Sequence, residues 1–205
     1  DFTATQLRSF GAAVDSIHRM RAASGLEPLE LIHASNSGAV LGHPLDDLTM
    51  VRPGIMAYGY YPDPETPRTI ELVPVMTLYT KVSFVKQVRV GETVGYGRTW
   101  TAPHDTWIAT VPVGYADGFS RLNSNTGRML IGGKSYPVAG RVCMDQTMLD
   151  LGPEEPTVKV GDDVVWLGRS GDESIDAAEL AATMGTIPYE VTSLIPPRVQ
   201  RVYVQ

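Results

Sequence analysis

The opening residues carry apolar side chains at steps of three and four positions, the spacing of one face of a helix. These apolar residues are Leu7, Phe10, Val14 and Ile17. Thr3 to Gln6 has the Thr-x-x-Gln form of a capping box, in which each side chain satisfies a free backbone amide at a helix start. Gly25 suits the end of this helix, because glycine readily adopts the left-handed conformation that often follows a last turn. The pattern therefore predicts one long helix at the start of the chain.

Two short apolar segments follow, separated by a polar turn and a second helical segment. Leu29 to His33 and Met50 to Arg52 are candidate strands. Between them, a short helix is expected to begin near Ser37 and to end before Pro44. This alternation of helix and strand is typical of an α/β unit with parallel strands.

The character of the sequence changes after residue 60. Three prolines between residues 62 and 67 have the composition of a linker. Beyond them, β-branched and aromatic residues dominate, and glycine-containing turns separate the runs. The expected β runs are 73–90, 106–113, 128–131, 136–150 and 164–167. A late helix is expected from Ile175 to Met184, with Ser174 as its cap and Gly185 as its end. The sequence thus predicts the end of an α/β domain followed by a mainly β domain.

Composition narrows the class of protein. The chain has 205 residues and a formal net charge of −6, which argues against nucleic-acid binding because that needs a basic surface. With 43% hydrophobic and 20% charged residues, it is typical of a globular chain with room for one domain or two. Its single cysteine, Cys143, excludes an internal disulfide framework. The cytoplasm is the simpler compartment for such a chain, although a secreted bacterial protein can also lack disulfides. No membrane span or signal peptide is visible, and an opening without Met is expected of a fragment or a processed chain.

Polar residues follow both candidate strands of the α/β part. Ser37, within Asn36-Ser37-Gly38, offers a hydroxyl and free amides to an anion, although a plain helix cap is an alternative. Arg52 precedes a glycine that would let a backbone approach a ligand, although a strand end with a surface arginine explains it too. In a TIM barrel, the loops after the last two strands commonly bind phosphate. The four histidines lack the spacing of metal ligands. Among them His33 alone is considered for a role, because it stands at the end of the first candidate strand.

Three segments of the β part place polar side chains in tight turns. Tyr96 lies between two glycines and Tyr115 follows Gly114, although an ordinary aromatic in a turn explains each equally well. The segment 140–145 ends a strand in polar residues. Its cysteine lies beside Met144 and is more often a small core residue than a nucleophile. Spacing suggests neither a Cys–His nor a Ser–His–Asp arrangement, so spacing alone leaves the chemistry open.

Taken in order, these segments resemble the second half of the alanine racemase family, bacterial enzymes that use pyridoxal 5'-phosphate. Each segment is weak, but the ordered set is highly specific and covers nearly all of residues 29–205. The matching segments are 33–38, 51–55, 58–59, 94–100, 112–118, 140–146, 161–162 and 187–191. The resemblance implies the last part of a TIM (β/α)8 barrel in residues 1–62 and a C-terminal β domain in residues 63–205. It also implies a cytoplasmic homodimer with an active site shared between subunits, which interconverts L-alanine and D-alanine for peptidoglycan.

The resemblance also assigns roles to individual residues. The implied cofactor-binding residues are Ser37, Gly54, Ile55 and Tyr189 at the phosphate, Arg52 at the pyridine nitrogen, and His33 in support of Arg52. Tyr96 is implied to be one of two acid/base catalysts and to act on the cofactor of the other subunit. The implied substrate-side residues are Met144, through its backbone at the carboxylate, and Tyr115, Arg141 and Asp145 around it. No metal ion is implied.

These residue types suit racemisation, which removes the α-proton from one face of the substrate and returns a proton to the other. Two acid/base groups on opposite sides of the cofactor plane are required. In the family they are a tyrosine and the lysine that holds pyridoxal phosphate as an aldimine. A free phenol has a pKa of about 10, so a tyrosine base needs cationic neighbours. Arg52 cannot readily protonate the pyridine ring, which favours racemisation over side reactions.

One family feature, the lysine that holds the cofactor, has no counterpart in the sequence. The lysines are Lys81, Lys86, Lys134 and Lys159, all in the β part. They are expected to be solvated surface charges, so the chain is expected to be inactive by itself. Two other interpretations remain open. One is a non-catalytic binding or assembly module of the same fold, and the other is a racemase for serine or a broader set of amino acids.

Overall fold

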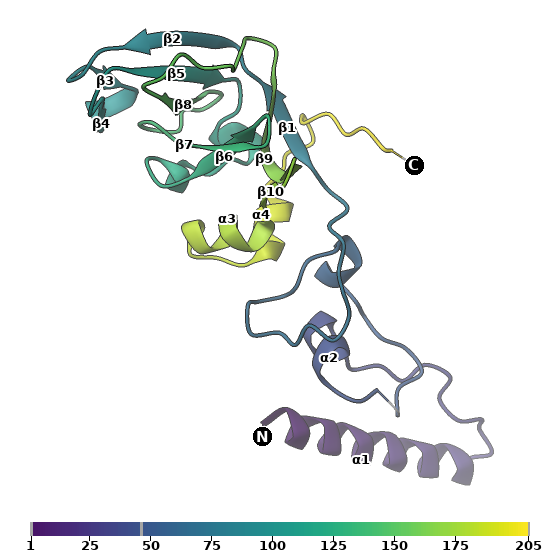
Figure 1. The fold of residues 1–205 in the computed structure, drawn as a ribbon. Coiled ribbons are helices and arrows are strands. Elements are labelled where there is room, and N and C mark those ends of the chain that lie inside the picture. Colours follow the sequence, from purple (N-terminus) through teal and green to yellow (C-terminus); the bar gives the residue numbers. More distant parts are fainter. Residues whose placement is uncertain (1, 46, 205) are drawn as a thin grey trace. The chain divides into compact units, whose positions relative to one another are not determined.

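The computed structural model describes residues 2–45 and 47–204, and the chain divides into two units, residues 1–72 and 73–205. Each unit is described by itself. The first contains α1 (Phe2–Ala23), α2 (Ser37–Gly42) and the 3-10 helix η1 (Ile55–Tyr58), joined by extended segments (Figure 1). The second contains all ten strands of the described residues.

The predicted long helix is present as α1, and its end is where the sequence places it. Gly25 follows the last turn in the left-handed conformation, with φ of 68°. The capping box at its start is wrong, because the helix already includes Phe2 and Thr3 therefore lies inside the first turn. Phe2 is compatible with a helix, so nothing in the sequence stops the helix from extending beyond the Thr-x-x-Gln pattern.

The two predicted strands of the first unit are extended segments that run side by side, but they are not regular β-strands. The backbone amides of Thr49 and Met50 donate to the carbonyl of Ile32, and the amide of Arg52 donates to that of Ser35. The return bond of a ladder is missing, because the amide of Ile32 donates to the Thr49 hydroxyl at 2.8 Å. That hydroxyl in turn donates to the carbonyl of Glu30. A threonine side chain thus takes the place of a backbone partner and interrupts the ladder.

The second unit is built from antiparallel sheets. One sheet has the order β1-β9-β6-β7, with β10 also paired to β9, a second has the order β2-β5-β8, and β3 pairs with β4. The strands are β1 (Leu78–Lys81), β2 (Phe84–Val88), β3 (Thr93–Val94), β4 (Trp100–Thr101), β5 (Thr106–Val111), β6 (Arg128–Ile131), β7 (Lys134–Pro137), β8 (Thr147–Gly152), β9 (Asp163–Ser170) and β10 (Glu173–Ile175). The predicted run 136–150 is interrupted by an irregular segment between β7 and β8, and this segment carries several candidate site residues.

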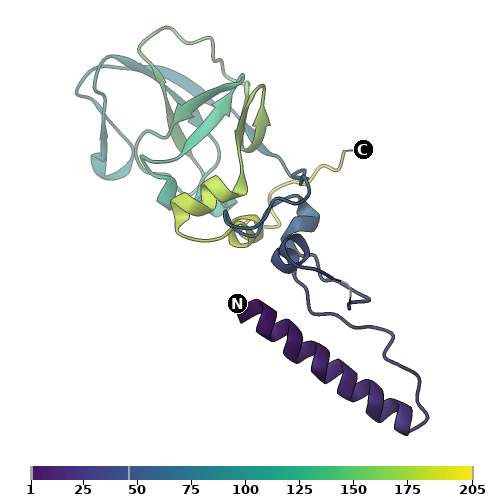
Figure 2. The same ribbon diagram turned by 60° about the horizontal axis from the view of Figure 1, so that its bottom comes forward.

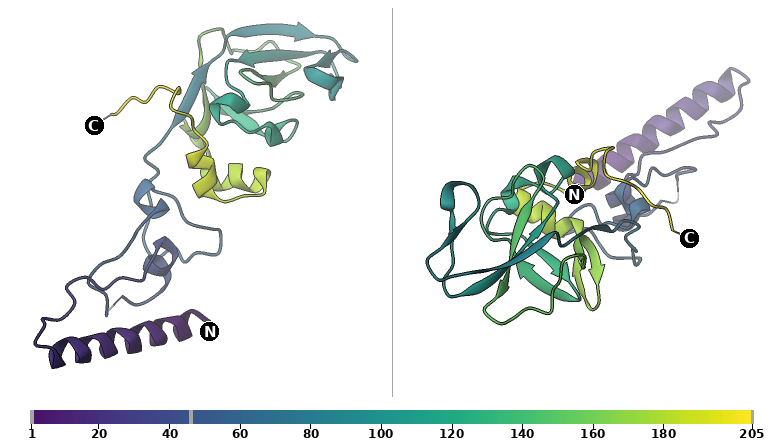
Figure 3. Two further views of the ribbon diagram at one scale, coloured as in Figure 1. Left: turned by 180° about the vertical axis from the view of Figure 1, so that it is seen from behind. Right: turned by 90° about the horizontal axis from the view of Figure 1, so that it is seen from above.

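Short helices complete the second unit. They are η2 (Tyr96–Arg98), η3 (Tyr115–Asp117), η4 (Arg121–Asn123), α3 (Ala177–Met184) and α4 (Pro188–Ser193). The late helix begins two residues after its predicted start, because Ser174 and Ile175 belong to β10 and Asp176 supplies the cap. Figure 2 shows α3 and α4 side by side, and Figure 3 shows the chain leaving α4 as an extended C-terminal segment.

An aromatic contact in the core and an arginine–carboxylate pair hold the strands of the second unit and α3 together. Phe119 and Trp166 pack edge to face, with ring centroids 5.6 Å apart. Arg128 on β6 makes two hydrogen bonds to the Glu179 carboxylate on α3, at 2.7 and 2.8 Å. A bidentate arginine–carboxylate pair fixes orientation as well as distance. The strands and α3 therefore form a rigid base for the turns that carry the candidate site.

Candidate active site

Ser37 organises the polar end of the first unit. Its side chain is buried, and its hydroxyl accepts hydrogen bonds from the backbone amides of Gly54, at 2.9 Å, and Met56, at 3.3 Å. A hydroxyl has two acceptor positions and one proton to donate. Both acceptor positions are thus used, and the Ser37 hydroxyl remains a donor.

Backbone amides lie next to this hydroxyl. Asn36 caps α2, because its side chain accepts from the amide of Ala39 at 3.1 Å. The amides of Gly38 and Ile55 stand in first helical turns, where no intrahelical acceptor exists. Within the described residues neither amide makes a hydrogen bond. The helix-cap interpretation therefore holds for Asn36, while Ser37, Gly38 and Ile55 offer donors to an anion.

Arg52 is tied to the same turn. Its guanidinium donates to the carbonyl of Ala34 at 2.9 Å, and its backbone amide donates to that of Ser35 at 2.8 Å. The side chain is otherwise exposed, with the rest of its donors available. His33 is exposed, and its ring makes no hydrogen bond to any described residue. Arg52 is thus anchored at both its backbone and its side chain to the turn 34–35. Within the described residues, His33 makes no hydrogen bond to Arg52.

A cavity of about 430 Å³ in the second unit brings together five of the residues singled out from the sequence. It is lined by Tyr96, Tyr115, Arg121, Arg141, Val142, Cys143, Met144 and Asp145. The cavity combines two phenols, two guanidinium groups and a carboxylate. Such a set can bind an anionic ligand and exchange a proton with it.

Glycines determine how Tyr96 enters this cavity. Gly95 and Gly97 on either side have φ of 77° and 71°, a conformation that other residues rarely adopt. A Cβ on Gly95 would lie 3.2 Å from the backbone nitrogen of Arg141, so the two segments are in close contact. Tyr96 is 73% exposed. The turn therefore leaves Tyr96 at the exposed edge of the cavity that Arg141 also lines, rather than packed in the core.

The turn that carries Tyr115 is fastened to the segment after Val142. The amides of Tyr115 and Ala116 donate to the carbonyls of Cys143, at 3.0 Å, and Met144, at 2.9 Å. Gly114 is required at this contact, because a Cβ there would lie 2.2 Å from the Cys143 oxygen. These contacts hold two walls of the cavity together.

The segment 143–146 forms a closed turn with free amides. The amide of Cys143 donates to the carbonyl of Gln146 at 2.9 Å. Among the hydrogen bonds of the described residues, none has the amide of Met144 or Asp145 as its donor. A carboxylate in the cavity would find backbone donors here, which suits the role expected of Met144.

Burial and charge act together on the thiol of Cys143. Burial raises the pKa of Cys143, the nearby Asp145 carboxylate raises it further, and Arg121 opposes them. A raised pKa keeps the thiol protonated and unreactive near neutral pH. Cys143 is therefore a packing residue in the cavity wall, as its position beside Met144 in the sequence suggests.

Arg121 is the cavity residue that the sequence reasoning missed. It opens η4, and no turn glycine or motif marks it in the sequence. Its only signal is its place six residues after Tyr115, which means little without the fold. Tyr189, which the resemblance assigns to the cofactor phosphate, lies on α4 of the second unit. Its side chain is half-buried, and its carbonyl accepts from the hydroxyls of Thr192 and Ser193.

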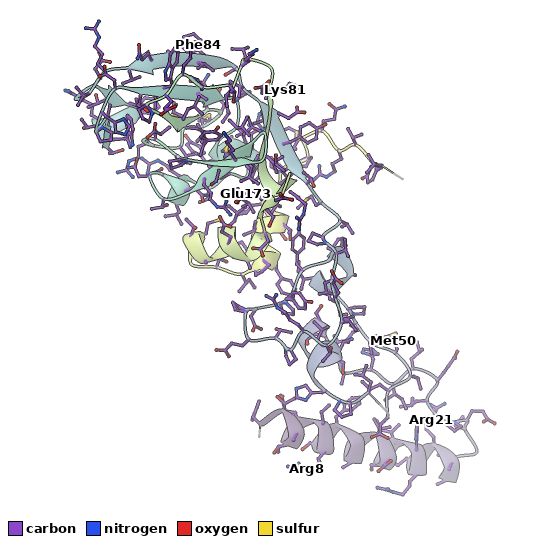
Figure 4. All side chains as sticks on the ribbon, viewed as in Figure 1. Arg8, Arg21, Met50, Lys81, Phe84 and Glu173 are labelled. Atoms are coloured by element: carbon purple, nitrogen blue, oxygen red, sulfur yellow. The ribbon has the colours of Figure 1, made fainter. Side chains whose placement is uncertain are left out.

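The four lysines are all exposed. Lys81, labelled in Figure 4, pairs with Asp163 at 2.7 Å, and this hydrogen bond raises the pKa of Lys81. An exposed, ion-paired ammonium is poorly suited to forming an imine, which needs a neutral amine.

Among the described residues, no helix is long and apolar enough to cross a membrane.

Family models and relatives agree on what the chain is similar to. The model "Alanine racemase, N-terminal domain" matches residues 1–62, and "Alanine racemase, C-terminal domain" matches residues 75–203. The alanine racemase of Cutibacterium acnes is 50% identical over 204 residues, which is 100% of this chain and 52% of that protein. The alanine racemase of Clostridium novyi is 40% identical over 206 residues, again 100% of this chain and 52% of that protein.

Solved structures show the same likeness. An alanine racemase of Clostridium difficile 630 has a TM-score of 0.88 at 37% identity and covers 99% of this chain and 52% of its own. The Bacillus anthracis alanine racemase with bound L-Ala-P has a TM-score of 0.85 at 36% identity, with the same coverage. This confirms the predicted fold class, an α/β part followed by a mainly β domain. The chain spans about half the length of these relatives, and it belongs to the alanine racemase family.

Proposed function

We propose that the protein carrying this chain interconverts L-alanine and D-alanine with pyridoxal 5'-phosphate, and that this chain supplies one acid/base catalyst and most substrate contacts. The observation that carries the proposal is the cavity in which Tyr96, Arg141 and the free amide of Met144 lie together. The named relatives are alanine racemases. The lone cysteine favours the cytoplasm as the compartment, and the product is suited to peptidoglycan synthesis.

The residues of the first unit fit the phosphate and ring of this cofactor. The Ser37 hydroxyl has only its proton left to share, and the amides of Gly38 and Ile55 are free donors. A phosphate dianion needs several converging donors of this kind. We assign the phosphate to Ser37, Ile55 and Tyr189, with Gly54 beside it as the residue whose amide holds the Ser37 hydroxyl, and the pyridine nitrogen to Arg52 with His33 beside it. Arg52 is already held by the carbonyl of Ala34, which leaves further donors for the ring.

The cofactor, when bound, supplies the electron sink that acidifies the α-proton of alanine. The Oη atom of Tyr96 takes or returns that proton on one face of the substrate. Arg141 and the amide of Met144 bind the substrate carboxylate and neutralise its charge. Tyr115 and Asp145 line the approach to this position.

We place the lysine of the second face outside this chain, because all four lysines here are exposed and belong to the second unit. We further propose that Tyr96 serves the cofactor of the partner subunit in a homodimer. The end of a TIM barrel is the part of the fold that residues 1–62 would supply. The chain alone is accordingly proposed to be inactive.

The experiment is to express the full-length protein that contains this sequence and to measure D-alanine formed from L-alanine. We expect turnover that depends on pyridoxal phosphate. Ser37→Ala should weaken cofactor binding by about 10-fold, the usual effect of losing one hydrogen bond to a charged group. Ser9→Ala is the matched control, because Ser9 is exposed on α1. Cofactor-independent turnover, or equal cofactor affinity in both variants, would overturn the assignment.

A further inference from the structure

A loop outside the motifs joins three walls of the cavity. Ser124 and Asn125 follow η4, and Asn125 adopts φ of 61°, which asparagine tolerates better than most residues. The Asn125 Oδ1 atom accepts from the amide of Gly140 at 2.7 Å, and its Nδ2 atom lies 3.4 Å from the carbonyl and the hydroxyl of Thr99. One side chain thus contacts the end of the Tyr96 turn and the start of the Arg141 segment.

Ser124 extends the same set of contacts. Its hydroxyl accepts from the amide of Val142 at 3.1 Å and donates to the carbonyl of Arg121. The amides held by the two residues therefore flank Arg141 on both sides. Arg121, at the start of the same loop, lines the cavity with Arg141. The pair Ser124–Asn125, which we name the clamp, connects the segments that carry Tyr96, Arg121 and Arg141.

Close backbone packing makes this connection stiff. Gly140 has φ of 86°, and a Cβ there would lie 2.7 Å from the carbonyl oxygen of Val94. The strand end before Tyr96 thus rests directly on the segment before Arg141. The clamp also bonds Thr99, Gly140 and Val142, so a shift of the end of the Tyr96 turn or of the Arg141 segment would break a hydrogen bond.

We propose that Asn125 is a positioning residue that sets the place of the Tyr96 phenol relative to Arg141 and the substrate, an inference that rests on the proposed racemase function. Asn125 touches neither substrate nor cofactor. It acts through Thr99 and Gly140 on the two turns that do. Because a misplacement of about 1 Å can cost about 100-fold in rate, loss of the clamp lowers the rate of the proton transfer made by Tyr96.

Two substitutions of Asn125 distinguish the effect of its side-chain hydrogen bonds from the effect of its backbone conformation. Asn125→Gly removes every side-chain bond but keeps the left-handed conformation, which glycine adopts freely. Asn125→Asp keeps an acceptor for Gly140 and loses only the donor to Thr99. Thr126→Val is the matched control, because Thr126 is exposed in the same loop and, among the described residues, its hydroxyl bonds the carbonyl of Leu122 alone.

The test measures kcat, KM and the primary isotope effect of α-deuterated L- and D-alanine in the full-length protein. In Asn125→Gly we expect kcat to fall by about 10- to 100-fold. We expect KM to change little and the isotope effect to rise for one enantiomer only. Asn125→Asp should show most of the same loss in kcat, because it gives up the contact to Thr99 at the end of the Tyr96 turn, and Thr126→Val should match the wild type. Equal values in Asn125→Gly and Thr126→Val, or an equal rise for both enantiomers, would overturn the proposal.

A second measurement does not depend on activity. Hydrogen exchange at the amides of Gly140 and Val142 should accelerate at least 10-fold in Asn125→Gly and Ser124→Ala, respectively, and stay unchanged in Thr126→Val. Unchanged exchange in the first two variants would refute the clamp even if the protein is an active racemase. Faster exchange in a protein that forms no D-alanine would instead support the clamp and refute the proposed function.

Discussion

Replacing Gly114 by alanine is the sharpest structural test of how the cavity is held together. Gly114 has an extended backbone, with φ of −152°, so an alanine costs nothing in backbone conformation. The new Cβ would lie 2.2 Å from the Cys143 oxygen and 2.6 Å from the carbonyl carbon of Met144. Both are backbone atoms of the cavity wall, so rotation of a side chain cannot relieve the clash and the backbone itself has to shift.

The magnitude follows from these contacts. Overpacking of this kind costs about 1–3 kcal/mol. The displaced wall also strains two backbone hydrogen bonds, from Tyr115 to Cys143 and from Ala116 to Met144, each worth about 1 kcal/mol. Because some of these bonds survive a small shift, we expect Gly114→Ala to lose about 2–4 kcal/mol of unfolding free energy.

Urea unfolding followed by tryptophan fluorescence measures this loss. The three tryptophans of the chain, Trp100, Trp107 and Trp166, all lie in the second unit. Gly132→Ala is the control, because a Cβ there meets nothing within 4 Å and only its φ of 57° opposes the change. That control should lose about 1–2 kcal/mol and keep full racemase activity in the full-length protein. Gly114→Ala should lose activity by about 100-fold. Wild-type stability and wild-type activity in Gly114→Ala would refute the reasoning.

Three further predictions concern the chemistry. Arg52→Glu in the full-length protein should lower the rate of racemisation and raise pyruvate formation from L-alanine, because a carboxylic acid can share a proton with the pyridine ring. Unchanged rates of both reactions would place Arg52 away from the ring. The rate at which the Cys143 thiol reacts with iodoacetamide should reach half its maximum at a higher pH than the rate of a free cysteine does, because burial and Asp145 raise the pKa of Cys143. Asp145→Asn should shift this midpoint to a lower pH. The 205-residue chain alone should form no D-alanine above the rate of free pyridoxal phosphate, as measured by a coupled D-amino-acid oxidase assay.

Much of the candidate site could be predicted because its residue types stand in recognisable turns. Tyr96 is marked by the glycines on both sides, and Ser37 by the Asn–Ser–Gly turn before a short helix. The order of these turns along the chain then indicated the family. Neither inference needed the three-dimensional arrangement.

Other features depend on contacts that the sequence does not display. Arg121 and Asn125 matter through what they touch across the fold, and an isolated arginine or asparagine in a polar loop has no distinguishing pattern. Thr49 is a typical strand residue by propensity, yet its hydroxyl replaces a backbone partner of Ile32 and interrupts the predicted ladder. The cap of α3 fell on Asp176 rather than Ser174 because the preceding residues pair with β9, a long-range preference that overrides a local one.

The most direct test of the account is proton exchange in the Tyr96→Phe variant of the full-length protein. This change removes the phenolic proton-transfer group and keeps the ring, and such groups are worth about 10² to 10⁴ in rate. With L-alanine and D-alanine incubated separately in D2O, we expect the variant to bind the cofactor normally. We also expect α-deuterium incorporation to be lost from one enantiomer and retained for the other. Equal, near-wild-type racemisation and exchange from both enantiomers would contradict the role of Tyr96 and the proposed division of labour between this chain and the rest of the protein.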